Sequence, residues 1–157
     1  MSKVKLYVFD IDGTMANIDH RKHHLVTKGN KKNWEPFFRE QRKDTPHWPV
    51  FDVMKALTLT GNKCIVVTGR MEQHRQDSFE WINEHHDLPF PNDDLYMRAN
   101  GDHTDDDELK WNIVQKILKD NPDYELAALF DDRHRIIDKF RSEGVYTFET
   151  NQYREEF

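Results

Sequence analysis

The 157-residue sequence contains one cysteine, Cys64, so no disulfide can form within the chain. It also lacks an apolar run long enough to span a membrane, and its N-terminus shows no signal-peptide pattern. We therefore expect neither a disulfide-stabilised secreted domain nor a membrane protein, and we predict a cytoplasmic location.

Positive charge is scarce over most of the chain, because 23 Lys and Arg stand against 29 Asp and Glu, for a formal net charge of −6. This balance argues against broad non-specific binding to nucleic acid. Residues 19–44 are the exception, with eight basic and four acidic residues and the histidines His20, His23 and His24. Their charge is compatible with a solvated face or with a surface that meets an anionic substrate. The histidines are a weak zinc set, because no cysteine or clear fourth ligand accompanies them.

Apolar runs and helical periods alternate through the rest of the sequence. The expected strands are 6–9, 63–67, 94–98, 126–130 and 145–148, and the expected helices are 50–60, 72–86, 105–119 and one around 136–140. This alternation is typical of an α/β fold with a parallel sheet and right-handed crossovers. The polar segment 15–49 interrupts the pattern after the first strand. We expect it to be an insertion over the strand ends, with a short helix after Asn33 and a loop at 45–49.

Two carboxylates end the first strand. Asp10 and Asp12 follow the buried run Leu6–Phe9, and Gly13 then allows a sharp turn. Ligands of open α/β sheets bind at the carboxyl ends of the strands, so chemistry is expected here. Buried paired carboxylates repel each other unless a cation such as Mg²⁺ or a shared proton compensates, and one carboxylate could attack phosphorus while the other moves a proton. A polar turn without function is the alternative explanation.

Polar residues also end two other predicted strands. Thr68, Gly69 and Arg70 follow the second strand, and Asp131 and Asp132 follow the fourth. A sheet kept only for stability would not need acids at two strand ends and a hydroxyl with a guanidinium at a third. The three strand ends together therefore indicate a site for phosphate and a metal ion.

In chain order, this pattern resembles the four motifs of haloacid dehalogenase (HAD) superfamily phosphatases, carried here by Asp10-Ile-Asp12-Gly-Thr, Thr68, Lys110 and Asp131-Asp132. The resemblance implies an α/β fold with a doubly wound parallel sheet, in strand order 3-2-1-4-5, and a small cap inserted after strand 1. Residues 1–157 would then form a single HAD-like phosphatase domain with the cap insertion at about 15–49.

The same resemblance implies a role for each motif. Asp10 attacks the phosphomonoester and forms an aspartyl-phosphate, while Asp12 protonates the leaving alkoxide and later deprotonates the hydrolytic water. Thr68 hydrogen-bonds to the phosphoryl oxygens, and Lys110 balances negative charge, although by itself it would be explained as an exposed helix lysine. The expected cofactor is Mg²⁺, held by the Asp10 side chain, the Asp12 backbone carbonyl, Asp131 and Asp132.

A narrower resemblance, to the 3′-phosphatase domain of phage-type polynucleotide kinase/phosphatase, rests on the strings Val67-Thr68-Gly69-Arg70, Leu95-Tyr96-Met97-Arg98, Asp106-Asp107-Glu108-Leu109-Lys110 and Phe130-Asp131-Asp132-Arg133. It implies that Arg21, Gly69, Arg70 and Asp106 serve the phosphate site, with Asp106 orienting Lys110 from one helical turn away. A solvated surface is the alternative explanation for the two arginines. The sequence has no Gly-x-x-x-x-Gly-Lys-Ser/Thr phosphate loop, so we expect no kinase domain in this chain.

These resemblances imply a phosphoric monoester hydrolase that removes 3′-phosphates from DNA or RNA ends in nucleic-acid repair. A phosphatase of mononucleotides or other small phosphomonoesters is an alternative that the net negative charge favours, whereas the basic insertion favours a nucleic-acid end. A non-catalytic binding module is less favoured, because it predicts a damaged motif. Trp34, Phe37 and Trp48 could stack a base, although helical spacing of aromatic residues more often marks a core. No feature of the sequence specifies an oligomeric state.

Overall fold

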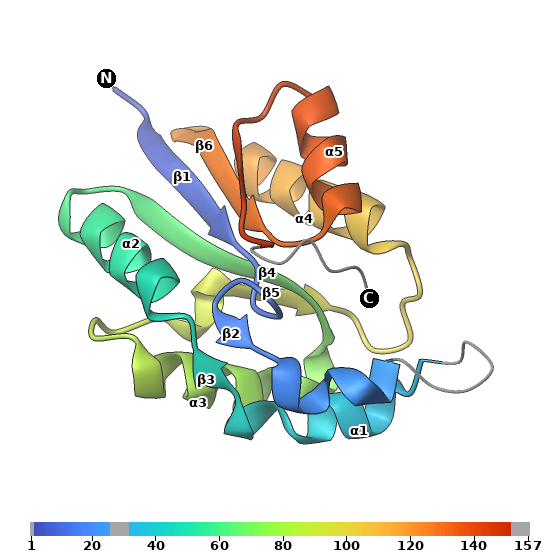
Figure 1. Ribbon diagram of the computed structural model, residues 1–157. Coiled ribbons are helices and arrows are strands. Elements are labelled where there is room, and N and C mark those ends of the chain that lie inside the picture. Colours follow the sequence, from blue (N-terminus) through green and yellow to red (C-terminus); the bar gives the residue numbers. More distant parts are fainter. Residues whose placement is uncertain (1, 26–31, 152–157) are drawn as a thin grey trace.

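The computed structural model describes residues 2–25 and 32–151 of the chain. Its centre is a parallel five-stranded sheet in the order β5-β4-β1-β6-β7 (Figure 1). The strands are β1 (Val4–Phe9), β4 (Lys63–Met71), β5 (Leu95–Arg98), β6 (Tyr124–Asp131) and β7 (Thr147–Glu149). When only the strands of this sheet are numbered, the order is 3-2-1-4-5, so the predicted α/β fold and strand order are confirmed.

Strand β1 is buried because its apolar side chains alternate between two cores, one on each face of the sheet. Leu6 and Val8 pack into one core together with Phe140. Phe9 packs into the other core together with Trp81. The central strand is therefore covered on both faces, as a parallel sheet requires.

Helices cover both faces of the sheet, which gives three layers (Figure 1). α2 (Trp48–Leu59) and α3 (Arg75–His85) pack on the face that carries Phe9. α4 (Asp106–Asp120) and α5 (His134–Ser142) pack on the opposite face. The short 3-10 helices η3 (Glu72–His74) and η4 (Asn92–Asp94) precede α3 and β5. None of the helices in the described part of the chain combines the length and apolar character needed to cross a membrane.

The inserted segment, residues 15–49, lies between β1 and α2. It contains β2 (Ala16–Asn17), η1 (Asp19–Leu25), α1 (Trp34–Arg39), η2 (Gln41–Lys43) and β3 (Thr45–Pro46). Its side chains Met15, Ile18 and Phe37 are buried in the core that α2 and α3 also line, and Figure 1 shows the segment on the α3 side of the sheet. Residues 26–31, with the basic Lys28 and Lys31, lie outside the described residues, as do residues 1 and 152–157. That this segment is a cap on a single domain of residues 1–157 stays a prediction.

The structure differs from the expected elements in three places. The expected loop 45–49 contains β3 and the start of α2, because β3 pairs with β2 and Pro49 fits the first turn of a helix. The expected helix 72–86 begins as a 3-10 turn, and its α-helical part starts at Arg75. Strand β4 continues to Met71 through an irregular register with β5, so the Thr-Gly-Arg motif lies within the strand and not after it.

Trp81 joins α3 to the inserted segment. Its side chain is 1% exposed, and its Nε1 donates a hydrogen bond to the backbone carbonyl of Asp44 at 2.9 Å. If a buried carbonyl loses its hydrogen-bond donor, the free energy of its desolvation is no longer offset. This bond therefore stabilises the position of Asp44.

Replacing Trp81 by Phe is expected to lower the free energy of unfolding by about 1–3 kcal/mol, because an aromatic ring remains but the buried carbonyl loses its donor. Urea denaturation measures this change. The matched control Trp48→Phe alters a side chain that is 53% exposed and should change the free energy of unfolding by less than about 0.5 kcal/mol. Equal effects of the two substitutions would contradict the structural role of this hydrogen bond.

Candidate active site

The centre of the site is a buried lysine between two strand-end carboxylates. Lys110 Nζ lies 2.7 Å from Asp10 Oδ1 and 2.7 Å from Asp131 Oδ2, so α4 is joined to the ends of β1 and β6. Lys110 is only 3% exposed, which excludes the exposed helix lysine considered above. Burial alone would lower its pKa, but the charges of Asp10 and Asp131 outweigh burial and raise it. The ammonium group is therefore a fixed positive charge at neutral pH.

Asp10, Asp131 and Asp132 form an acid cluster in which one oxygen of each carboxylate lies within 4.8 Å of the others. Burial and then the charge of Asp131 raise the pKa of Asp10 to about 7, although Lys110 opposes the shift. Burial and the charges of Asp10 and Asp131 likewise raise the pKa of Asp132 well above its usual range. One lysine therefore does not neutralise three neighbouring acids.

A divalent cation fits this cluster. Asp132 Oδ1 is buried and has no hydrogen-bond partner among the described residues, and a buried carboxylate oxygen without a donor is costly unless a cation approaches it. Three carboxylates are the donor set of a hard ion such as Mg²⁺. Within residues 2–25 and 32–151, no other group of three His, Cys, Asp or Glu side chains meets the same distance criterion, so His20, His23 and His24 do not form a zinc set.

Two glycines allow the acids to approach the neighbouring backbone. Gly13 has φ +84°, and a Cβ there would lie 2.1 Å from Asp132 Oδ2. A Cβ at Gly69 would lie 2.8 Å from Asp106 Oδ1. Both distances are shorter than van der Waals contact, so a larger residue at either position would displace the acid.

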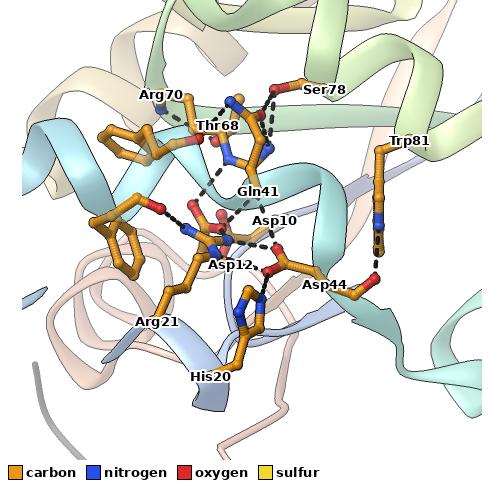
Figure 2. A network of polar contacts seen from close by, with 12 residues as sticks. Asp10, Asp12, His20, Arg21, Gln41, Asp44, Thr68, Arg70, Ser78 and Trp81 are labelled. Atoms are coloured by element: carbon orange, nitrogen blue, oxygen red, sulfur yellow. Dashed lines mark hydrogen bonds and ion pairs between the residues drawn. The ribbon is translucent and has the colours of Figure 1, made fainter. Parts of the chain in front are cut away.

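Asp12 lies between the side chains of two arginines (Figure 2). Arg70 donates from Nε to Asp12 Oδ2 at 3.1 Å and from Nη2 to Oδ1 at 2.6 Å. Arg21 donates from Nη2 to Oδ1 at 2.5 Å. Burial alone would raise the pKa of Asp12, but the charges of Arg70 and Arg21 lower it well below its usual range. In this arrangement Asp12 is an ionised carboxylate, and its contacts with the two arginines disfavour its protonation.

Arg21 is fixed by residues of the inserted segment, chiefly Asp44. Its Nε and Nη2 donate to the Asp44 carboxylate at 2.7 and 2.6 Å, and its Nη1 donates to the Phe37 carbonyl at 3.1 Å. His20 also contacts Asp44, at 2.6 Å between Nε2 and Oδ1. Arg21 is 0% exposed, so the solvated-surface explanation is wrong. Asp44 was not predicted as a site residue, and nothing in the sequence distinguishes it from the other acids of the inserted segment.

Arg70 is equally buried, with 1% exposure. Its Nη1 donates to Gln41 Oε1 at 2.5 Å and to Ser78 Oγ at 2.9 Å. Its backbone N–H donates to Thr68 Oγ1 at 3.2 Å. Gln41 and Ser78 were also not predicted, because neither belongs to a motif. Arg21 and Arg70 therefore position Asp12 in this structure, and their contact with a phosphate stays a prediction.

Asp106 differs from its expected role. It accepts hydrogen bonds from Arg98 and Arg133, whereas Lys110 Nζ donates to Asp10 and Asp131. The expectation that Asp106 orients Lys110 from one helical turn away is thus wrong for this structure. Residues four apart share a helix face, but closer partners from the strand ends take both side chains.

A cavity of about 520 Å³ opens beside these groups, within the roughly 300–1,000 Å³ usual for small-molecule sites. It is lined by six of the predicted site residues: Asp10, Asp12, Gly69, Arg70, Asp106 and Lys110. The other predicted residues are buried side chains that are bonded to this lining or lie close to it: Arg21, Thr68, Asp131 and Asp132. The folded chain therefore gathers all ten predicted site residues in one place.

The parallel sheet in this strand order, with an acid pair after its central strand and a buried lysine bridging two strand ends, is that of a HAD-type phosphatase. The chain belongs to the family described as the polynucleotide kinase PNKP phosphatase domain, which it matches over residues 4–154. The predicted family and the phosphatase class are thereby confirmed.

Solved structures share the fold at low sequence identity. Chains in two structures of a Pnkp1/Rnl/Hen1 complex, one of them described as an RNA repair complex, match with TM-scores of 0.74 and 0.71 and identities of 21% and 22%. Each match covers 94% of this chain but only 45% and 42% of those chains, so this chain spans less than half of their length. The class C acid phosphatase from Bacillus anthracis matches with a TM-score of 0.68 at 12% identity, over 98% of this chain and 69% of that one.

Replacing Lys110 by Met is expected to lower the free energy of unfolding by about 3–5 kcal/mol, because the buried Asp10 and Asp131 lose their counter-charge. Urea denaturation at neutral pH without divalent cations measures the change. The matched control Lys116→Met alters an amine that is 76% exposed and pairs with Asp120, so less than about 0.5 kcal/mol is expected there. A Lys110→Met protein as stable as the control would show that the bridge does not hold the acids together.

Proposed function

We propose that this domain is a Mg²⁺-dependent phosphomonoesterase that works through an aspartyl-phosphate and removes 3′-phosphates from nucleic-acid ends. The observation that carries the proposal is the contrast between two neighbouring carboxylates. Asp10 belongs to the acid cluster beside Lys110, whereas Asp12 is held by two arginines. Two acids in such different surroundings suit two roles, a nucleophile and a proton carrier.

In the first step, an Asp10 oxygen attacks phosphorus, the bond from phosphorus to the ester oxygen breaks, and an aspartyl-phosphate forms. Lys110 balances the negative charge that accumulates on the phosphoryl oxygens, and the Thr68 hydroxyl donates a hydrogen bond to one of them. Mg²⁺ would be held by Asp10, Asp131, Asp132 and the Asp12 backbone carbonyl, and it would offset the repulsion between nucleophile and phosphate.

Asp12 moves the protons. Its carboxylate accepts a proton from the water that hydrolyses the aspartyl-phosphate, and that proton is then available for the next leaving alkoxide. To hold the proton, Asp12 must lose part of its contact with Arg70 and Arg21. An entering phosphate dianion is itself a strong acceptor for guanidinium, so substrate competes with Asp12 for these arginines. This competition links substrate binding to the protonation of the acid.

The proposed substrate class is supported by the family and by the arginines in the cavity wall. The family is that of a polynucleotide phosphatase domain, and Arg98, Arg133 and Arg135 line the cavity beside the acids. The chains of the Pnkp1/Rnl/Hen1 RNA repair complex, which share the fold, support a role in nucleic-acid repair. A phosphatase of mononucleotides is the second candidate, because a cavity of about 520 Å³ is large enough to take one nucleotide.

These candidates are distinguished by measuring phosphate release from three kinds of substrate. The substrates are a 3′-phosphorylated oligonucleotide, the same oligonucleotide with a 5′-phosphate, and 3′- and 5′-mononucleotides. We expect the 3′-phosphorylated oligonucleotide to be preferred, with a Michaelis constant that rises steeply with salt. Asp10→Asn should lower turnover by at least about a thousandfold, whereas the matched control Asp138→Asn on α5 should not. Substantial turnover by Asp10→Asn would remove Asp10 as the nucleophile, and preference for a mononucleotide would establish the second candidate.

Mg²⁺ is expected to raise the melting temperature of the wild-type protein, because it binds the folded acid cluster and not the unfolded chain. At a concentration of one hundred times Kd, the added stability is about 2.7 kcal/mol. Asp132→Asn should fold but lose most of this gain, and excess chelator should abolish phosphate release. Activity that persists in excess chelator, or an equal gain in both proteins, would overturn the metal assignment.

A further inference from the structure

Helix α1 divides its three aromatic residues between the core and the cavity. Phe37 is 1% exposed, and its ring lies 4.2 Å below the Arg21 guanidinium carbon, so it fills the core of the inserted segment. Trp34 is 41% exposed, and Phe38 is only partly buried. Both side chains line the cavity that also contains Asp10. Core packing therefore explains Phe37 but leaves the position of the Trp34 indole unexplained.

Trp34, Phe38 and His74 form an aromatic row along the cavity wall. The rings of Trp34 and Phe38 are stacked, with centroids 5.8 Å apart and planes 16° apart. The centroids of Phe38 and His74 are 5.0 Å apart. Burial and the charge of Arg70 lower the pKa of His74, so its ring is neutral at neutral pH. The row is thus an uncharged π surface in a cavity whose other walls are mostly charged.

The two ends of this arrangement differ in chemistry. At one end, His74 lines the same cavity as Arg70, which contacts Asp12, and as Asp10 of the acid cluster. At the other end, Lys32 Nζ lies 5.5 Å from the centroid of the Trp34 ring. A phosphomonoester that also carries a flat, uncharged ring fits this combination, because its phosphate would meet Asp10 and Lys110 while its ring meets the row.

We infer that Trp34, Phe38 and His74 form a stacking platform for the nucleobase of the substrate's phosphorylated nucleotide. The inference rests on the proposed function and adds a binding subsite to it. Stacking uses the π face that every nucleobase has, so it tolerates any base identity. The platform therefore selects nucleotides over other phosphomonoesters, and it provides affinity without reading sequence.

The test compares two ligands that differ only in the base: adenosine 3′-phosphate and ribose 3-phosphate. Each ligand is titrated into the Asp10→Asn protein in the presence of Mg²⁺, and calorimetry measures its affinity without turnover. Trp34→Leu keeps an apolar side chain but removes the stacking ring. It should weaken the binding of adenosine 3′-phosphate about 5- to 100-fold and leave the affinity for ribose 3-phosphate unchanged. Trp34→Phe should recover most of the affinity. The matched control Trp48→Leu, at an exposed aromatic residue of α2, should bind both ligands as the parent does.

The platform would be overturned if Trp34→Leu lost affinity equally for both ligands or lost none. It would also be overturned if the parent protein bound the ligand with a base no more tightly than the ligand without one. The melting temperature of each variant separates these outcomes from unfolding, and Phe38→Leu provides a second loss of stacking in the same row. Failure of the proposed function is recognised separately, because it appears as no phosphate release from any phosphomonoester by the wild-type protein. The binding comparison remains decisive in that case.

Discussion

The structure depends on the placement of one positive charge among buried acids. Lys110 comes from the first turns of α4, and its ammonium group meets carboxylates at the ends of β1 and β6. The free-energy cost of removing such charges from water is offset only when they are closely paired. The bridge therefore joins a helix on one face of the sheet to two strand ends, and it still leaves the acid cluster with excess negative charge. A divalent cation would offset that excess.

A second constraint connects the inserted segment to the sheet through Asp12. Arg70 comes from β4 and Arg21 from η1, so the Asp12 carboxylate accepts hydrogen bonds from both the sheet and the inserted segment. The Asp44 carboxylate in turn accepts a hydrogen bond from Arg21, and Trp81 Nε1 donates to the backbone carbonyl of Asp44. Any movement of the inserted segment thus changes the environment of Asp12.

The sheet order explains why residues far apart in the chain meet. β1 lies between β4 and β6, so the carboxyl ends of these three neighbouring strands bring together Asp10, Thr68 and Asp131. The cavity beyond them is closed on one side by α1 of the inserted segment. The strand ends therefore supply the acids and the hydroxyl of the candidate site, while the inserted segment supplies part of the cavity wall.

The sequence by itself determined the strands, the α/β class, the strand order through the family resemblance, and the acids at the strand ends. The strands and the strand-end acids are local features, because an apolar run, a glycine turn and a motif are each contained in a few residues. Only the tertiary structure decided that Lys110 bridges two acids, that Asp106 binds Arg98 and not Lys110, and that Asp44 holds Arg21. Those partners are separated by up to 100 residues in the chain, and periodicity encodes which face is buried but not which long side chain reaches which carboxylate.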